Sequence, residues 1–274
     1  MEYFEYTFFQ NALIAIVLMS ICAALIGTYI ISRRLVAICG GITHSCFGGL
    51  GLGYFLGWNP LAMAALFAIG SSAAVEWSSR RYGMREDSAI AVTWAVGMAV
   101  GVLFVFLTPG NVPELNAFLF GNILTVGKED LLYFTIFTIV LSGFFALYYR
   151  KIVSVAFDRD FAQVSGLPVR MISYTMTVLV ALCIVLTIRI VGVMLLVSVL
   201  SLPMLSAEIC YQRFGSVALL SGVICLICSV AGLMLSTIVE VPCSGLIVLL
   251  MAGVFVVLRA TKSLVFEFKP LKKG

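Results

Sequence analysis

The chain contains a single histidine, His44, and it begins a glycine-rich segment in which Gly49, Gly53 and Gly57 recur every four residues. On a helix this spacing places the glycines on one face, where another helix backbone can approach closely. An ionisable side chain on such a tightly packed apolar helix is a candidate functional group. Imidazole is a ligand for zinc, iron and related ions. His44 is therefore predicted to be a metal ligand or a gate on a translocation path.

One histidine cannot make a metal site by itself, so His44 would need partners from another span or from a second copy of the chain. The alternative interpretation is structural: a histidine that is hydrogen-bonded to a neighbouring helix, with Thr43 or Ser45 beside it. Spacing alone leaves both interpretations open.

The remaining polar groups have structural explanations. Cys225 and Cys228 have C-x-x-C spacing but lie within an apolar run, where buried, unpaired thiols are expected. Glu76 and Glu208 are predicted to anchor the ends of spans by pairing with Arg80 and Arg213, and Glu86 and Asp87 open a helix, where the helix dipole favours acids. Pro203 lies within an apolar run and is predicted to kink its helix. The candidate helix-packing residues are thus Gly49, Gly53 and Gly57, and Pro203 is the candidate kink.

Several motifs of enzymes are absent from the sequence. No G-x-x-x-x-G-K-[ST] phosphate loop occurs, so ATP binding of the usual kind is not expected. The sequence also lacks H-E-x-x-H and G-x-S-x-G, and its apolar runs lack the acids and bases typical of proton-coupled transporters. We expect no catalytic residue, no bound cofactor and no nucleic-acid partner.

These residues must be positioned by a membrane-embedded fold. The chain has 274 residues, of which 62% are hydrophobic and only 11% charged, far from the composition of soluble domains. Since a span needs about 20 mostly apolar residues, the sequence predicts an all-α, polytopic membrane protein with one domain, 1–274, and about nine spans. The predicted spans are 12–31, 42–57, 60–77, 88–107, 131–149, 171–188, 190–209, 216–236 and 243–259.

The basic residues predict the orientation of the chain, because lysine and arginine are enriched in cytoplasmic loops. With the N-terminus outside, 15 of the 17 basic residues fall on the inner side, and only Lys128 and Arg189 remain outside. The inner residues are Arg33, Arg34, Arg80, Arg81, Arg85, Arg150, Lys151, Arg159, Arg170, Arg213, Arg259, Lys262, Lys269, Lys272 and Lys273. The C-terminus is expected to be cytoplasmic.

Two connections between spans are not predicted to be simple loops. The stretch 112–127 is too polar to span and too apolar for a solvated loop, which predicts a short helix packed against the bundle. The stretch 157–168 predicts an amphipathic helix in an inner loop, with Asp158 and Asp160 near its start, Gly166 as its stop and Pro168 beyond. A capped helix in this position suggests a docking element.

Five segments, in order, resemble the metal-type ABC permease family, which imports zinc, manganese or ferrous iron. Each segment is a weak signal, but five in the family's order on a matching topology are a strong one. They are the Gly40–His44 stretch with the following Phe47–Gly53, then Arg85–Ile90, Leu119–Leu124, Phe157–Pro168, and Val191–Val197 with Leu202, Pro203 and Ala207.

The resemblance implies a type II ABC importer fold in a bacterial inner membrane. It implies a homodimer surrounded by lipid, with the path of a divalent metal ion along the two-fold axis and His44 facing it. It implies that a separate ATPase docks beneath the 157–168 helix and that an extracytoplasmic metal-binding protein delivers the cargo. The residues expected to couple to the ATPase are Asp158, Asp160, Phe161, Ala162, Gly166, Leu167 and Pro168.

The chain departs from the family at one position: Gly40 stands where the family usually has an aspartate, four residues before the histidine. The missing oxygen ligand favours zinc or ferrous iron over manganese, and Cys46 is a candidate additional ligand. Three alternative functions stay open for the chain. The first is a permease for a metal chelate of the siderophore or cobalamin type, which would not need His44. The second is a secondary transporter, which would work without an ATPase, and the third is a membrane scaffold, which would tolerate any change at His44.

Overall fold

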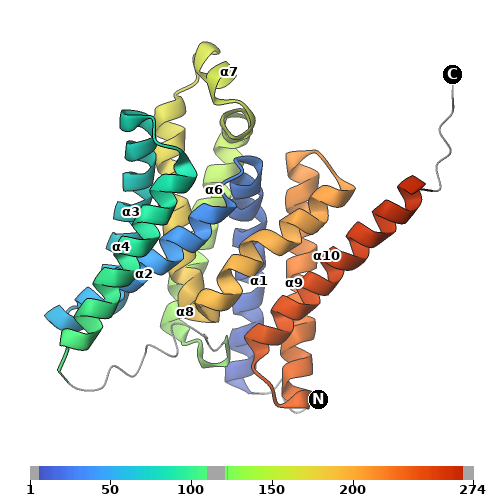
Figure 1. Ribbon diagram of the computed structural model, residues 1–274. Helices are drawn as coiled ribbons and strands as arrows, with labels where there is room; N and C mark the ends of the chain where they lie inside the picture. The colour runs from blue at the N-terminus through green and yellow to red at the C-terminus, as the bar shows by residue number, and fades with distance from the viewer. Residues whose placement is uncertain (1–5, 110–120, 122, 268–274) are drawn as a thin grey trace, which may run out of the picture.

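The computed structural model describes residues 6–109, 121 and 123–267, and in these residues the chain is a bundle of helices (Figure 1). The connection between α4 and α6 includes a short 3₁₀ helix, η2. The elements are α1 (Thr7–Ser32), α2 (Val36–Leu56), α3 (Pro60–Tyr82), α4 (Glu86–Leu107), η2 (Ile123–Thr125), α6 (Lys128–Phe157), α7 (Arg159–Val164), α8 (Val169–Cys210), α9 (Phe214–Val239) and α10 (Cys243–Glu267).

Eight of the described helices are long and apolar enough to cross a membrane, and one of them, α8, is bent back on itself into two antiparallel halves. α8 has 42 residues and contains a single non-helical residue, Gly192, with φ 77° and ψ 171°. The chain reverses direction there, so that both ends of α8 lie at the same end of the bundle (Figure 1). A left-handed φ is costly for residues with a Cβ, and glycine adopts it freely. The prediction of about nine spans, with a boundary near residue 189, is confirmed.

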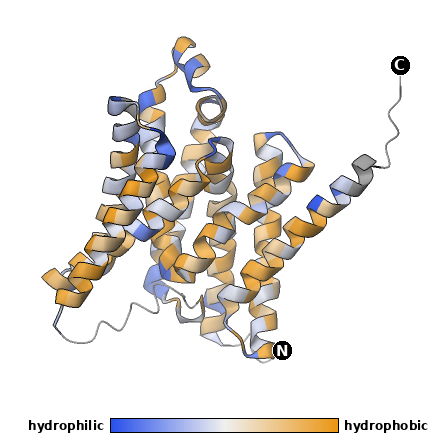
Figure 2. Cartoon of the chain, in the orientation of Figure 1, coloured by the Kyte–Doolittle hydropathy of each residue, from blue (hydrophilic) through white to orange (hydrophobic). Residues whose placement is uncertain are grey.

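α1 begins at one end of the bundle and α10 ends at the other, as an odd number of crossings requires (Figure 1). We call the end that carries α7 the α7 end and the other the far end. Most hydrophilic residues gather at these two ends, and the middle is hydrophobic (Figure 2). α1 and α8 form the centre, since 72% of the most apolar stretch of each is buried, against 17% for α4 and 11% for α10. Helices with such open apolar faces belong against lipid or another subunit.

The glycines after His44 bring α2 into close contact with its two neighbours. A Cβ at Gly49 would overlap the backbone of Met63 in α3, and one at Gly53 would lie 2.8 Å from Cα of Pro60. Gly57 has another role, because it ends α2 in the left-handed conformation with φ 68°. Thus two of the three glycines pack helices and the third terminates one.

A second set of glycines, on α2 and α4, joins those two helices. A Cβ at Gly48 would lie 2.8 Å from the carbonyl oxygen of Gly97, and one at Gly97 would lie 2.5 Å from Cα of Ser45. One turn further along, a Cβ at Gly51 would overlap the carbonyl oxygen of Gly101, and one at Gly101 would lie 2.6 Å from the carbonyl oxygen of Phe47. Since backbone meets backbone without intervening side chains, α2 and α4 form a closely packed pair.

Other local predictions can be compared with the structure. The C-x-x-C pair is unpaired and buried, with Cys225 0% and Cys228 5% exposed, as expected. Pro203 lies within helical backbone, and the irregularity in α8 is at Gly192 instead. Most of the stretch 112–127, including 112–120, lies outside the described residues. Its described part contains η2, with Ile123 and Val126 buried against the bundle.

Candidate functional site

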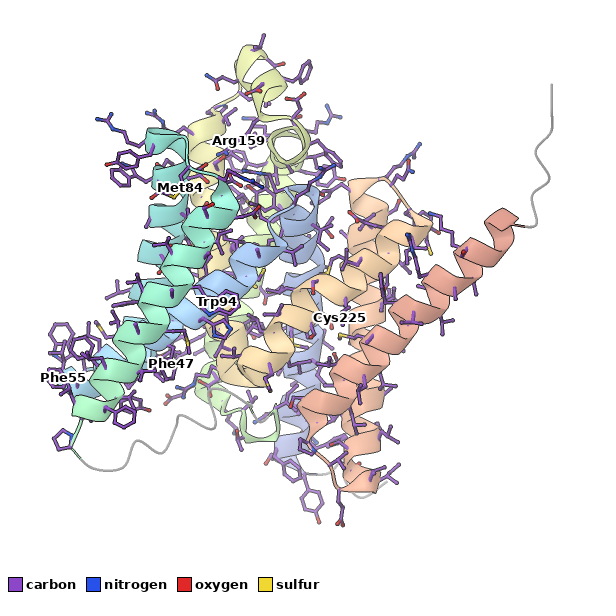
Figure 3. The ribbon with its side chains drawn as sticks, viewed as in Figure 1. Phe47, Phe55, Met84, Trp94, Arg159 and Cys225 are labelled. Atoms are coloured by element: carbon purple, nitrogen blue, oxygen red, sulfur yellow. The ribbon has the colours of Figure 1, made fainter. Side chains whose placement is uncertain are left out.

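His44 lies near the middle of α2, partly exposed, and its imidazole stacks on the indole of Trp94 from α4. The ring centroids are 4.4 Å apart and the ring planes differ by 7°. Figure 3 labels Trp94 midway along α4. Within the described residues His44 forms no hydrogen bond to a neighbouring helix. Of its two polar neighbours, Thr43 donates to the carbonyl of Cys39 on the same helix and Ser45 bonds to Ser71 of α3. In the described part of a single chain, the contact that His44 makes with a neighbouring helix is thus the ring stack on Trp94.

The face of α2 that carries His44 also carries Gly40 and Val36, because residues four apart lie on the same side of a helix. Gly40 is partly exposed, and a Cβ built on it would lie 3.6 Å from Cζ3 of Trp94. The indole thus covers both Gly40 and His44. Val36, roughly two turns or about 12 Å from His44 along the helix, lines a cavity at the α7 end.

The second candidate ligand, Cys46, does not join His44. Its side chain is 0% exposed and belongs to the apolar core, and residues two apart on a helix point to different sides. Nowhere in the described ranges do three or more histidine, cysteine or acidic side chains gather into a metal site. A single copy of the chain thus offers one imidazole to a cation, as the sequence predicts.

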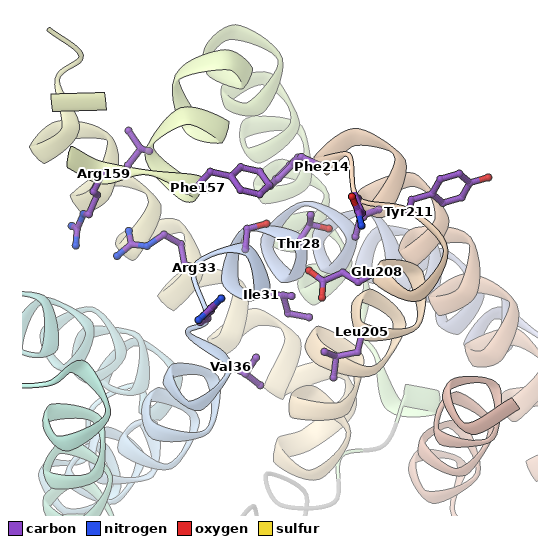
Figure 4. Close-up of a pocket in the computed structure, with 16 residues that line it drawn as sticks. Thr28, Ile31, Arg33, Val36, Phe157, Arg159, Leu205, Glu208, Tyr211 and Phe214 are labelled. Carbon is purple, nitrogen blue, oxygen red and sulfur yellow. The ribbon is translucent and has the colours of Figure 1, made fainter. Parts of the chain in front are cut away.

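The cavity at the α7 end has a volume of about 910 Å³ and opens between α1, α2, α6, α8 and α9. Its lining includes Arg33, Arg34 and Arg159 as bases and Glu208 as an acid. Figure 4 shows Glu208 reaching into the cavity from α8, with Arg33 and Arg159 on the opposite side. The predicted pairing of Glu208 with Arg213 is not among the ion pairs of the described residues, and Glu208 lines the cavity instead.

Two arginines and two glutamates form what we call the inner ion-pair cluster: Arg33, Glu76, Glu86 and Arg159. Arg159 of α7 pairs with Glu76 of α3 and lies 3.7 Å from Glu86 at the start of α4. Arg33 lies 3.6 Å from the same carboxylate. Arg159 also donates a hydrogen bond to Ser173 of α8, at 3.0 Å. The cluster therefore connects α7 to four other helices. Arg159 reaches Glu76 from across the fold. The side chain of Arg80, the partner predicted for Glu76, lies outside the described residues, so that pairing stays a prediction.

The 157–168 segment contains the expected short helix, α7. Asp158 caps it by accepting a hydrogen bond from the backbone N–H of Phe161 at 2.9 Å, and Gly166 follows in the left-handed conformation with φ 74°. Ala162 is buried, whereas Phe161 is 66% and Val164 89% exposed. Asp160, Leu167 and Pro168 complete the segment, with Asp160 and Pro168 exposed and Leu167 partly buried. α7 is thus fixed to the bundle through Ala162 and Arg159 and exposes the apolar side chains of Phe161 and Val164.

Sequence reasoning missed two residues at these sites, Trp94 and Arg159. Tryptophan is enriched at membrane interfaces, so a tryptophan near the middle of α4 was a detectable signal. The signal for Arg159 was weaker. A buried acid such as Glu76, which is 9% exposed, requires a cationic partner, but the sequence did not show which arginine would supply it.

Comparisons with known proteins agree with this architecture. The curated relatives include an uncharacterized membrane protein of Synechocystis sp., 36% identical over 199 residues that cover 73% of this chain and 71% of that protein. They also include the manganese transport system membrane protein MntC of Halalkalibacterium halodurans, 29% identical over 273 residues that cover 98% of this chain and 90% of that protein.

Among solved structures, PsaBC from Streptococcus pneumoniae in complex with Fab superimposes with a TM-score of 0.83 at 26% identity, covering 94% of both chains. The model of the ABC 3 transport family matches residues 5–262, which is nearly the whole chain. The resemblance to metal-type ABC permeases is confirmed, and the chain belongs to the ABC 3 transport family.

Proposed function

We propose that this chain is the membrane-spanning permease subunit of an ATP-driven importer of a divalent metal ion. The observation that carries the proposal is a lone, partly exposed imidazole on a closely packed helix, in a chain whose relatives include a manganese transport protein. The transported ion is the cargo of this protein and not a resident cofactor. Transport, rather than catalysis, is its role.

His44 is proposed to be a transient ligand on the path. Conduction requires binding that is weak enough for release, and one imidazole without a carboxylate provides weak binding. In a homodimer with the path along the two-fold axis, two copies of His44 would face each other. Because Gly40 contributes no oxygen ligand, zinc or ferrous iron is proposed as the preferred cargo, ahead of manganese.

α7 is proposed to be the docking element for a separate cytoplasmic ATPase. Support comes from the exposed apolar side chains of Phe161 and Val164 on a helix that projects from the bundle. The inner ion-pair cluster would transmit movement of α7 to α3 and α4. An extracytoplasmic metal-binding protein would deliver the ion at the far end.

The proposed orientation places the α7 end in the cytoplasm of a bacterial cell and the N-terminus outside. Support comes from the basic residues, because Arg33, Arg34, Arg85 and Arg159 lie at the α7 end, and Lys128 and Arg189 lie at the far end. Positively charged cytoplasmic loops are the general rule for helical membrane proteins.

The test is ATP-dependent uptake of zinc, manganese and ferrous iron by the permease co-expressed with its neighbouring ATPase, with wild type compared to His44→Ala. We expect uptake of free metal, strongest for zinc or ferrous iron, and its loss in His44→Ala at an unchanged protein level. Cys46→Ser is the matched control and should keep the ion preference. If no free metal moves, or if His44→Ala is silent, the proposal fails and chelates become the substrates to test.

A further inference from the structure

The side chain that covers the candidate path residues is Trp94, and nothing in the sequence motifs assigns it a role. It contacts the α2 face at two successive turns, stacking on His44 and lying over the position where Gly40 lacks a side chain. Trp94 is 43% exposed in the single chain, so its indole borders open space as well as α2. It is therefore a part of the surface that an ion beside His44 would meet.

Parallel stacking determines what the imidazole can do. Trp94 occupies one face of the ring, which fixes the ring plane and leaves the ring edge, where both nitrogens lie, uncovered by the indole. A metal ion binds a ring nitrogen in the plane of the imidazole, so stacking does not block coordination. The indole face is also attractive to cations within about 6 Å of its centre. The pair thus offers a cation one ligand atom and a neutral aromatic wall.

The same ring limits which side chains fit at position 40. A Cβ on Gly40 would be in ordinary van der Waals contact with Cζ3 of Trp94, at 3.6 Å. A carboxylate extends beyond its Cβ and would have to displace the indole or turn away from His44. The indole cannot retreat with its helix, because Gly97 and Gly48 hold the backbones of α4 and α2 together.

Resting on the proposed function, we infer that Trp94 is a specificity-determining residue of the path. It orients His44 and occupies the space in which an acidic ligand would otherwise stand. The path then presents nitrogen without oxygen, which disfavours manganese relative to zinc or ferrous iron. Trp94 and Gly40 act as a pair, since the small residue makes room for the large one.

The experiment is a double-mutant comparison of zinc and manganese uptake by the complete complex, using wild type, Gly40→Asp, Trp94→Ala and the double variant. Gly40→Asp alone is expected to leave the manganese-to-zinc ratio near that of wild type, because the indole blocks the carboxylate. The double variant is expected to raise that ratio by about tenfold more than the product of the single effects, as contacting residues are coupled. Trp94→Phe should stay close to wild type, since it keeps an aromatic face on His44. Trp77→Ala, at another exposed tryptophan on α3, is the matched control.

A second measurement reads the stack directly. The chain has three tryptophans, so Trp58→Phe with Trp77→Phe leaves Trp94 as the only indole fluorophore. Zinc added to the purified chain, without its partner subunits, is expected to change its emission, and His44→Ala is expected to abolish the change.

The outcomes separate this inference from the proposed function. A wild-type complex that moves no free metal overturns both. Metal uptake with additive effects of Gly40→Asp and Trp94→Ala, or with Trp94 emission insensitive to zinc, overturns only the role of Trp94.

Discussion

The middle and the start of α4 are held to the rest of the protein in opposite ways. At the middle, Gly97 and Gly101 meet the backbone of α2 directly, and the contact is one of shape alone. At the start, Glu86 lies near Arg33 and Arg159, and the contact is electrostatic. Backbone packing has no alternative arrangement at low cost, whereas ion pairs can separate and re-form in water.

This difference indicates how movement could pass through the molecule. α2 and α4 would move as one body, carrying His44 and Trp94 together, because their interface cannot slide. The ion pairs at the α7 end form the separable connection to α7. Coupling between α7 and the His44–Trp94 pair would be demonstrated by a substitution in the ion-pair cluster that changes metal transport.

The largest effect is expected from Gly97→Ala, at the close contact between α2 and α4. The new Cβ would lie 2.5 Å from Cα of Ser45, so α2 and α4 must separate. Overpacking of this kind is expected to cost about 3 kcal/mol of folding free energy. Thermal unfolding of the purified protein measures the loss. Gly143→Ala in α6, where a Cβ meets open space, is the matched control and should unfold at or above the wild-type temperature. Equal melting temperatures for the two variants would contradict the rigid contact.

The separable contact is tested by Arg159→Gln. Removing the charge takes one ion pair away from the buried carboxylate of Glu76, at an expected cost of about 2 kcal/mol. The larger consequence is functional: metal uptake per ATP hydrolysed should fall, because α7 would no longer be joined to α3 and α4. Parallel assays of uptake and ATP hydrolysis give this ratio.

Arg150→Gln, at an exposed position of α6, is the matched control for charge. A double exchange, Arg159→Glu with Glu76→Arg, should recover part of the ratio. An unchanged ratio in Arg159→Gln would remove the cluster from the coupling path.

The smallest effect is expected at Gly57, where conformation matters and contact does not. A Cβ at this position meets open space, but φ is 68°. Gly57→Ala should therefore cost about 1 kcal/mol, measured by thermal unfolding. Gly57→Asn should cost less, since asparagine tolerates the left-handed region. If alanine and asparagine behave alike, the backbone of α2 ends differently from the structure described.

The spans and the short helix α7 could be predicted because their signals are local. Runs of apolar residues specify helices that cross a membrane, and Asp158 and Gly166 are start and stop signals within one short segment. The placement of His44 on a glycine-packed helix likewise follows from spacing within α2.

Contacts between distant segments could not be predicted in this way. Glu76 and Arg159 are far apart in the sequence, and several arginines are equally plausible partners until α7 folds back over α3. The stacking of Trp94 on His44 depends on the register between α2 and α4, which the opposed glycines determine in three dimensions. That register cannot be deduced from a single sequence.

The reversal at Gly192 has a consequence for how the protein is made. The two halves of α8 are joined by one glycine with no hydrophilic loop between them. Sequential insertion of the two halves into the bilayer is therefore not expected. They must enter together as a helical hairpin, with Arg189 drawn to the far side at its tip. Arg189 meets Asp130 there at 2.6 Å, so the charge at the tip of the hairpin is paired once the fold is complete.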